Sequence, residues 1–274
     1  MPELPEVETI RLNLIYGTKD YPSILGTIIL RAVILWDRSL ATPAVDKFPS
    51  RVEGQALQSI GRRGKYLVLK LTRDFLLIHL RMSGDILIES EDESISVHHR
   101  MILYLDNGYR LAFNDPRKFG RVWLVADAGE ILSALGPEPL DESLTSIEFH
   151  RRITSHHRQL KPLLLDQSFF AGMGNIYTDE ALHLALLHPL LKSDQLTLEE
   201  SDRLLQSIRQ VLNEGIKRSG ASIDWVYRGG DFQNYFRVYQ RTGKPCYRCG
   251  NPIVRIVSVQ RGTHFCSHCQ PLKE

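Results

Sequence analysis

The sequence predicts an α+β protein with more than one domain. Short segments rich in β-branched and large apolar residues fill positions 24–126, amphipathic helical patterns follow, and all four cysteines lie after residue 245. With 274 residues, 43% of them hydrophobic, the chain can bury a sizeable core. At about 150 residues per domain, two domains are the default expectation.

The N-terminal part is predicted to be a β-sandwich or barrel that packs against an N-terminal helix. Asn107-Gly108 separates two alternating runs in MILYLDNGYRLAF (101–113), which is a strong hairpin pattern. Four further segments have the composition of strands: GTIILRAVILW (26–36), KYLVLKL (65–71), FLLIHLRM (75–82) and RVWLV (121–125).

The first residues, MPELPEVET, predict that helix but are only partly explained by it. Pro5 fits its opening position, Glu6 and Glu8 complement the positive end of its dipole, and apolar residues recur on one face. Pro2 and Glu3 have no role in this interpretation. Their chemistry therefore needs another explanation.

The second half of the chain is predicted to be helical. LGPEPLD (135–141) is a linker, because its prolines block both helix and sheet hydrogen bonds. Helices are expected at 179–187, which stops before His188-Pro189, and at 197–220, which opens with a Thr197/Glu200 capping box. Residues 221–234 show no period and are expected to form a loop.

The four cysteines predict a structural zinc site. CYRC (246–249) and CSHC (266–269) are separated by 266 − 249 − 1 = 16 residues, the spacing of a four-thiolate site. The alternative is a pair of disulfides, which the absence of a secretion signal disfavours. The expected ligands of one zinc ion are Cys246, Cys249, Cys266 and Cys269.

The distribution of charge favours a nucleic acid as partner. The formal net charge is only +2, but residues 232–273 contain seven Lys or Arg and no acid. Residues 62–81 contain six Lys or Arg against Asp74. No apolar run approaches the ~18 residues of a membrane span, and the acidic start differs from a signal peptide. We therefore expect a cytoplasmic protein without a membrane partner.

Two further segments allow a structural and a functional interpretation. FFAGMGNIY (169–177) could direct backbone N–H groups at a phosphate, or be an ordinary turn between helices. NDPRKFGR (114–121) places Arg117 and Phe119 on one side of an extended chain. A cation beside an aromatic wedge can enter a base stack, although an Asp-Pro turn with incidental charges explains the segment too.

Together these segments closely resemble the bacterial formamidopyrimidine-DNA glycosylases, which excise oxidised purines from DNA. The resemblance covers essentially the whole chain. Its markers are, in order, PELPEVET, RRGKYL, HLRMSG, DPRKFG, GPEPL, GMGNIY, VYQRTGKPC and QRGTHFC followed by the last cysteine.

The resemblance implies an organisation of the chain and a set of partners. It implies a β-sandwich catalytic domain (1–134), a linker (135–144), a helix–two-turn–helix DNA-binding domain (145–234) with a lesion-capping loop (221–234), and a zinc finger (235–274). It also implies a monomeric bacterial enzyme of base excision repair. Such an enzyme acts on damaged double-stranded DNA of the nucleoid, with one structural zinc ion and no organic cofactor.

The resemblance also assigns the catalytic residues. Once Met1 is removed, Pro2 would be the Schiff-base nucleophile, since a terminal amine titrates near pH 8 and is partly neutral at physiological pH. Glu3 matches the general acid that opens the deoxyribose ring, and Glu6 matches a supporting acid. Lys65 corresponds to the proton donor for β-elimination and Arg261 to the donor for δ-elimination.

DNA contacts follow from the same match. Met82, Arg117 and Phe119 resemble the three residues that fill the gap left by an extruded nucleotide, with Arg117 facing the orphaned cytosine. The residues matching phosphate contacts are His98, Lys161 and Asn175.

Six residues depart from the common family pattern, and two other functions are compatible with parts of the sequence. Residues that differ from the common family pattern are expected to affect phosphate affinity, its pH dependence or loop mobility: Val97, Arg100, His156, His157, Ser219 and Gln240. One alternative is an endonuclease VIII-type glycosylase for oxidised pyrimidines, whose members tend to begin Pro-Glu-Gly-Pro, whereas this chain has Leu4. The other is a non-catalytic zinc-finger DNA-binding protein, which would have no use for Pro2, Glu3 and Lys65.

Overall fold

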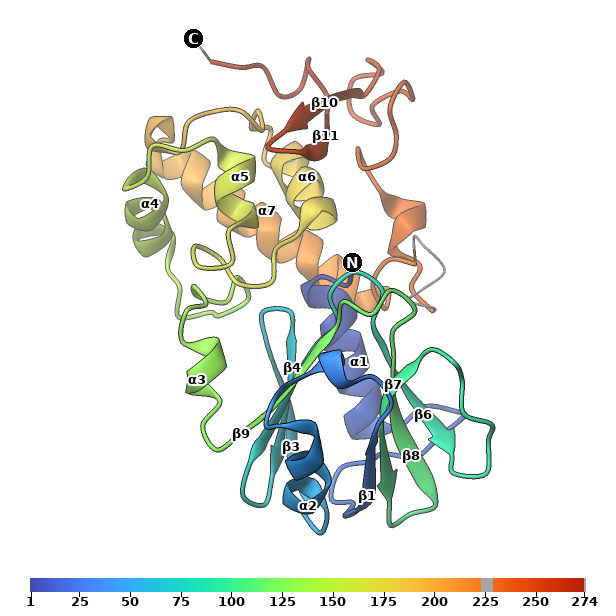
Figure 1. Cartoon of the computed structure of the whole chain (residues 1–274). Coiled ribbons are helices and arrows are strands. Elements are labelled where there is room, and N and C mark those ends of the chain that lie inside the picture. Colours follow the sequence, from blue (N-terminus) through green and yellow to red (C-terminus); the bar gives the residue numbers. More distant parts are fainter. Residues whose placement is uncertain (223–228, 274) are drawn as a thin grey trace. The chain divides into compact units, whose positions relative to one another are not determined.

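The computed structural model describes residues 1–222 and 229–273, and their contacts divide into two compact units (Figure 1). The N-terminal unit comprises Met1–Ser133 and the described part of Ser222–Gly230. The C-terminal unit comprises Ala134–Ala221 and the described part of Asp231–Glu274. Residues 223–228 of the predicted lesion-capping loop lie outside the described residues, and the finer domain limits stay a prediction.

The N-terminal unit contains two sheets, as predicted. One has the strand order β1-β7-β8-β6 and the other β2-β9-β5-β4-β3, and all pairs are antiparallel except β2 with β9. The first sheet consists of β1 (Ile29–Ile34), β6 (Asp85–Ser90), β7 (His99–Leu105) and β8 (Tyr109–Asn114). The second consists of β2 (Leu40–Thr42), β3 (Leu57–Arg63), β4 (Tyr66–Leu71), β5 (Phe75–His79) and β9 (Arg121–Val125).

The hairpin between β7 and β8 forms at the predicted turn. Gly108 has φ +80, a conformation that costs a side-chain-bearing residue about 1–2 kcal/mol. The Asn107 side chain accepts a hydrogen bond from the Tyr109 N–H (3.2 Å). The turn thereby sets the register in which Leu103 opposes Leu111.

The N-terminal helix α1 (Leu4–Tyr16) joins both sheets in one core. Val7, Ile10 and Leu14 are buried in a single hydrophobic cluster with residues of both sheets, and the helix packs against β3 and β4. Glu3 is the N-cap and forms a capping box with Glu6, whose carboxylate accepts the Glu3 N–H at 2.7 Å. From the sequence, Glu6 was expected to complement the helix dipole. In the structure it also caps the helix by accepting the Glu3 N–H.

The C-terminal unit is built around helices and a small hairpin. The Thr197/Glu200 capping box is confirmed, because the Thr197 side chain accepts the Glu200 N–H (3.2 Å) and Glu200 accepts the Thr197 N–H (3.1 Å). The main elements are α4 (Ser146–Thr154), α5 (Leu160–Leu165), α6 (Asn175–Leu184), α7 (Leu198–Lys217), β10 (Val254–Ser258) and β11 (Arg261–Phe265). Short elements elsewhere in the chain are η1 (Asp37–Ser39), η2 (Val45–Lys47), α2 (Phe48–Val52), α3 (Gly129–Leu132), η3 (Ser193–Gln195) and η4 (Phe232–Tyr235).

The limits of α6 differ from those predicted. The helix begins at Asn175 rather than 179, because Gly174 is its N-cap, and it ends at Leu184. Leu186 has φ +58, which stops the helix before the predicted end at 187. The GMGN segment therefore leads directly into a helix N-terminus.

Two of the departures from the family pattern lie at strained backbone positions. Ser219 and Gln240 both have φ +56, the left-handed region in which glycine is favoured. At both positions this chain carries a side chain in a backbone conformation that disfavours one. None of the helices in the described residues is both long and apolar enough to cross a bilayer.

Candidate functional site

The chain start is held tightly in the N-terminal unit. Pro2 and Glu3 are both buried, with Glu3 only 3% exposed, whereas Met1 is 44% exposed. The capping box fixes Glu3 at the beginning of α1. A nitrogen at position 2 is therefore placed on a rigid helix end rather than on a frayed terminus.

Lys65 lies in a turn that hydrogen bonds attach to the same helix, α1. It lies in the turn between β3 and β4 and is 5% exposed. Arg62, at the end of β3, donates to Glu8 of α1 (3.0 Å) and to the Gly64 carbonyl (3.0 Å), which fastens the turn to α1. Glu8 also binds Arg11, and together these interactions lower the pKa of Glu8 despite its burial, which acts in the opposite direction.

His79, which the sequence analysis did not select, lies beside this turn. It is the last residue of β5, pairs with Tyr66 across the sheet, and its ring meets the Tyr66 ring edge-on at 4.6 Å. Burial, then the charges of Arg81 and Lys65, lowers its pKa to about 3. The Nδ1 atom accepts the Arg81 N–H (3.0 Å), so the neutral ring carries its proton on Nε2. His79 belongs to the HLRMSG motif, but only the burial and the neighbouring charges in the fold indicate a functional role for it.

This histidine should make the stability of the protein depend on pH. An unfolded histidine titrates near pH 6.5 and folded His79 near 3, so between these values the unfolded chain binds the proton more tightly. Stability is therefore unaffected above pH 6.5 and falls as the pH drops below it. Between pH 6.5 and 5 the loss should be about 2 kcal/mol. Urea unfolding of the wild type and a His79→Gln variant at both pH values measures it, and an equal pH dependence in the two chains would show the assignment to be wrong.

The DPRKFG loop is organised around the buried carboxylate of Asp115, another residue that the sequence analysis passed over. Asp115 is 1% exposed and accepts hydrogen bonds from the backbone N–H groups of Arg117 (3.2 Å) and Gly120 (2.7 Å). The Arg117 and Phe119 side chains are exposed, and the guanidinium carbon lies 5.6 Å from the Phe119 ring centre. The loop thus presents a cation and an aromatic ring on a rigid base.

Met82 belongs to a neighbouring loop that the same carboxylate anchors. Ser83 donates its hydroxyl to Asp115 (2.5 Å), and Met82 beside it is 43% exposed. The motif glycines allow this close packing, because a Cβ at Gly84 would lie 2.5 Å from the Leu80 carbonyl oxygen and one at Gly120 2.2 Å from the Phe113 ring. The structure therefore brings Met82, Arg117 and Phe119 onto two joined loops.

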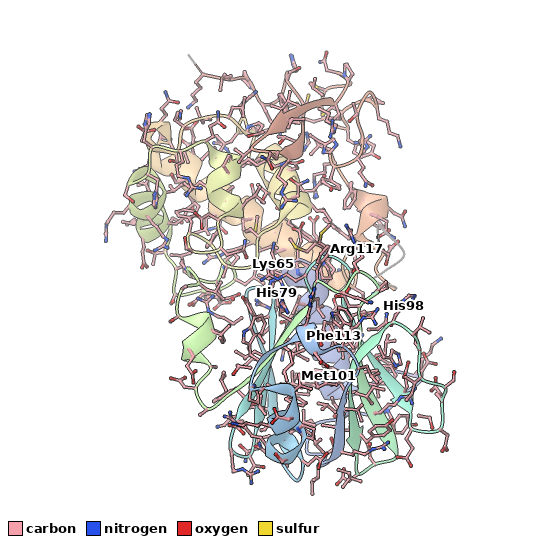
Figure 2. The ribbon with its side chains drawn as sticks, in the orientation of Figure 1. Lys65, His79, His98, Met101, Phe113 and Arg117 are labelled. Atoms are coloured by element: carbon pink, nitrogen blue, oxygen red, sulfur yellow. The ribbon has the colours of Figure 1, made fainter. Side chains whose placement is uncertain are left out.

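His98 and Arg100 support the base of the Arg117 loop. The His98 carbonyl accepts the Asp115 N–H (2.9 Å), and the His98 side chain is exposed. Arg100, one of the departures, is 5% exposed and donates to the carbonyls of Asp115 (2.7 Å) and Val97 (3.0 Å). It therefore acts on loop structure rather than as a surface cation. In Figure 2, Lys65, His79 and Arg117 lie at one end of the N-terminal unit.

Three residues predicted to contact or cleave DNA meet in the C-terminal unit. The Gly262 carbonyl accepts hydrogen bonds from Lys161 Nζ (2.9 Å) and Asn175 Nδ2 (3.2 Å), and the neighbouring Arg261 is exposed at the start of β11. Lys161 is fully buried, and its ammonium also binds Asp179 at 2.5 Å. The structure thus gives Lys161 a role within the protein, while its predicted phosphate contact stays a prediction.

Adjacent buried carboxylates on α6 hold the C-terminal segments, and sequence periodicity gave no indication of them. Asp179 accepts from His264 N (2.8 Å) in β11 as well as from Lys161. Glu180 accepts from three consecutive backbone N–H groups at distances of 2.7 to 2.9 Å: Arg237, Val238 and Tyr239. One helix therefore fixes both the hairpin that bears Arg261 and the segment 237–239, which precedes the zinc-binding cysteines.

The four cysteines form a structural zinc site. Their Sγ atoms all lie within 4.8 Å of one another, with Cys249–Cys266 at 3.5 Å and Cys246–Cys269 at 4.0 Å. A tetrahedron with Zn–S bonds of about 2.3 Å has S···S edges of about 3.8 Å, so the four atoms fit one zinc ion with no open position. Hydrogen bonds from the Asn251 side chain and backbone lower the pKa of Cys249 to about 6, which provides a thiolate at neutral pH.

Comparison with known proteins identifies the family. Models of the formamidopyrimidine-DNA glycosylase N-terminal domain and H2TH domain match residues 1–122 and 135–226, and a zinc finger found in FPG and IleRS matches 243–272. The chain belongs to the formamidopyrimidine-DNA glycosylase family. It is a DNA glycosylase of base excision repair, and the predicted family, fold class and zinc ion are confirmed.

Full-length relatives agree with this membership. The glycosylase is 41% identical to the formamidopyrimidine-DNA glycosylase of Protochlamydia amoebophila, over 98% of this chain and 99% of the relative. It is 45% identical to that of Chloroflexus aurantiacus, over 98% of both chains. It also resembles the crystal structure of Lactococcus lactis Fpg (MutM) in complex with DNA containing N7-benzyl-Fapy-dG. The TM-score is 0.90, at 35% identity over 98% of this chain and 100% of that one.

Proposed function

We propose that the protein is a bifunctional DNA glycosylase and AP lyase that excises oxidised purines, 8-oxoguanine and formamidopyrimidines, from double-stranded DNA. The observation that carries the proposal is the buried Pro2-Glu3 pair at the start of α1, in a unit that also presents Lys65 and the Arg117 loop. Structurally similar chains are recorded in complexes with DNA that contains Fapy-dG, carbocyclic 8-oxo-G or an abasic site. The protein acts as a monomer, with no organic cofactor.

The first step uses the nitrogen of Pro2 after Met1 has been removed. Its lone pair forms a bond to C1′ of the lesion nucleotide as the bond from C1′ to the base breaks, and the base leaves with that electron pair and takes up a proton. The nitrogen, now positively charged, gives its proton to the Glu3 carboxylate. Glu3 returns that proton to the ring oxygen, the C1′–O4′ bond opens, and the freed nitrogen lone pair completes an iminium. The secondary amine makes this intermediate cationic without a further proton.

Strand cleavage follows from the same iminium, which makes the adjacent C2′ proton acidic. Loss of that proton expels the 3′ phosphate, and Lys65 supplies a proton to the departing oxygen. A second elimination expels the 5′ phosphate, with Arg261 as donor and phosphate ligand. The neutral His79 beside Lys65 presents an Nε2–H donor that suits a backbone phosphate as well. His98, Lys161 and Asn175 supply further phosphate contacts in this proposal.

Extrusion of the lesion leaves a gap that the two joined loops are suited to fill. Unstacking costs a few kcal/mol, and insertion of Met82 and Phe119 replaces part of the lost stacking. Arg117 has several N–H donors that can meet the acceptor edge of the orphaned cytosine. Asp115 holds the loop backbone so that these contacts need little reordering.

Replacing Arg117 by alanine should relax the preference for the base opposite the lesion. A specific base contact contributes about 1–3 kcal/mol of discrimination, so the ratio of kcat/KM for cytosine over adenine opposite 8-oxoguanine should fall roughly tenfold or more. Excision rates on matched duplexes measure this ratio. Lys118→Ala, in the same loop, is the control, and an unchanged ratio in Arg117→Ala would contradict the assignment.

Borohydride reduction tests the proposed activity as a whole. Incubation with 8-oxoguanine duplex and borohydride should attach the chain covalently to DNA, because the iminium is reduced to a stable amine. A non-catalytic zinc-finger protein would bind the duplex and stay free. Efficient attachment to oxidised pyrimidine duplex, with none to 8-oxoguanine duplex, would instead indicate an endonuclease VIII-type enzyme.

A further inference from the structure

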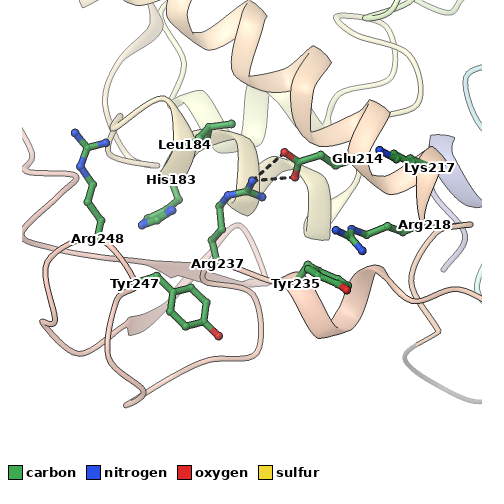
Figure 3. Close-up of a pocket in the computed structure, with 9 residues that line it drawn as sticks. All are labelled: His183, Leu184, Glu214, Lys217, Arg218, Tyr235, Arg237, Tyr247 and Arg248. Carbon is green, nitrogen blue, oxygen red and sulfur yellow. Dashed lines mark hydrogen bonds and ion pairs between the residues drawn. The ribbon is translucent and has the colours of Figure 1, made fainter.

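A pocket in the C-terminal unit is lined by residues that were predicted neither to be catalytic nor to contact DNA. It encloses about 600 Å³, within the range of small-ligand sites, and is shown in Figure 3. We call it the basic pocket. Its lining residues are His183, Leu184, Glu214, Lys217, Arg218, Tyr235, Arg237, Tyr247 and Arg248.

The charge of the basic pocket suits an anion. Four of its lining residues are Lys or Arg and only Glu214 is acidic, and that carboxylate already accepts two hydrogen bonds from Arg237 (2.8 and 3.1 Å). Lys217 and Arg248 are exposed, and within residues 1–222 and 229–273 neither side chain forms an ion pair. Lys217 complements the dipole at the end of α7, but this does not explain Arg248, which comes from the zinc-binding segment.

Two exposed tyrosines border the same cations. Tyr247 is 74% exposed, and the guanidinium of Arg241 lies 3.6 Å from its ring centre. Arg241 is itself buried and donates to the carbonyls of Arg237 (2.6 Å) and Pro245 (2.9 Å), so the support under the ring is rigid. Tyr235 is 45% exposed and has Arg218 3.1 Å from its ring centre. Rings held in this way beside cations are typical of stacking platforms for unpaired bases.

The basic pocket is distinct from the predicted DNA contacts of this unit. Asn175, which meets Gly262, is the first residue of α6, whereas His183 lies in the last turn of that helix. At 1.5 Å per residue, the two ends are about 12 Å apart along the helix axis. One phosphate cannot contact both.

We propose that the basic pocket binds an unpaired nucleotide of a DNA strand, with its phosphate on Lys217 and Arg248 and its base stacked on Tyr247. A paired base has both faces covered by its neighbours in the duplex, so the exposed ring selects single-stranded DNA. The pocket gives the protein a second contact with DNA, in addition to the lesion site. It depends only on residues of the C-terminal unit.

Fluorescence anisotropy of a labelled thymidine oligonucleotide tests this site. The zinc-loaded full chain is first saturated with an unlabelled short duplex that carries a tetrahydrofuran abasic analogue, which occupies the lesion site. The labelled strand should still bind. Lys217→Ala/Arg248→Ala should weaken its binding about tenfold and lower the slope of log K against log salt by about 0.7, the value for one phosphate contact on a single strand.

A matched variant and a second substitution complete the test. Arg151→Ala/Lys192→Ala removes the same charge elsewhere in the C-terminal unit and should bind the strand like the wild type. All of these chains should excise 8-oxoguanine at the wild-type rate, so a failure of the proposed function would appear separately. Tyr247→Ala should weaken strand binding about tenfold, whereas Tyr247→Phe should not.

Three results would overturn the proposal. The first is equal strand binding by the two double variants. The second is displacement of the strand by a polyglutamate peptide together with no effect of Tyr247→Ala, which would assign the pocket to an acidic protein segment. The third is competition by thymidine monophosphate at the same concentration per nucleotide as an unlabelled strand, which would make a free nucleotide the occupant.

Discussion

A chain that retains Met1 is expected to lose covalent attachment to lesion DNA almost completely. The nitrogen of Pro2 is then part of a peptide bond, and its lone pair is delocalised into the carbonyl group. It cannot attack C1′, so attachment under borohydride should fall by about a thousandfold or more, which is the scale expected when a nucleophile is removed. A protease-resistant extension before Pro2 provides such a chain, and mass spectrometry verifies its N-terminus.

Two controls separate the loss of the nucleophile from the loss of the fold. Pro2→Gly with a free terminus keeps an amine and should retain weakened excision. Both chains should keep wild-type affinity for the tetrahydrofuran duplex and a normal unfolding midpoint, because the Glu3/Glu6 capping box does not require a free amine. Full-rate attachment by a chain shown to carry Met1 would exclude Pro2 as nucleophile.

Removal of zinc is expected to abolish DNA binding while the N-terminal unit stays folded. The zinc-binding segment has a small hydrophobic core, in which the four cysteines pack with Val238 and Ile253. Zinc binding in small metal-dependent domains contributes about 10–16 kcal/mol, so this segment should unfold without the ion. Arg261 would then lose its position, because β11 depends on the same fold. The N-terminal unit has its own hydrophobic cluster and should keep its sheets.

Chelation with a metallochromic indicator follows zinc release, circular dichroism follows the sheets, and anisotropy follows binding of the tetrahydrofuran duplex. Cys249→Ser should reproduce the loss of binding, and Ser267→Ala, in the other C-x-x-C turn, should not. Unchanged affinity of the zinc-free chain for the duplex would show that the finger has no part in DNA binding.

Local patterns predicted the elements whose interactions are themselves local. The Thr197/Glu200 capping box, the Asn107-Gly108 hairpin and the two C-x-x-C pairs each involve groups a few residues apart, and the structure places them as expected. The end of α6 was predicted less well. Its limits depend on Gly174 and on the left-handed Leu186, which periodicity does not reveal.

The predicted site residues required the resemblance to a family, and their surroundings required the fold. The resemblance predicts Lys161 as a phosphate ligand. In the structure its ammonium binds Asp179, 18 residues later, and the Gly262 carbonyl, 101 residues later. Arg100 appeared as a surface departure, yet it is buried beneath the Arg117 loop. In both cases at least one partner lies 15 or more residues away, so no local pattern could show whether the charge faces water or the protein.

The sequence by itself determined the N-terminal helix, the β7–β8 hairpin, the helix α7, the zinc ligands and the family, because these follow from short-range periodicity, from ligand spacing and from motifs in a fixed order. The tertiary structure alone decided the neutral state of His79, the support of the Arg117 loop by Asp115 and the gathering of cations around Tyr247. These depend on burial and on charges brought together from separate elements. The protonation state of a side chain and the lining of a pocket depend on the groups within a few ångströms. Those groups come from distant parts of the sequence and are brought together only when the chain folds.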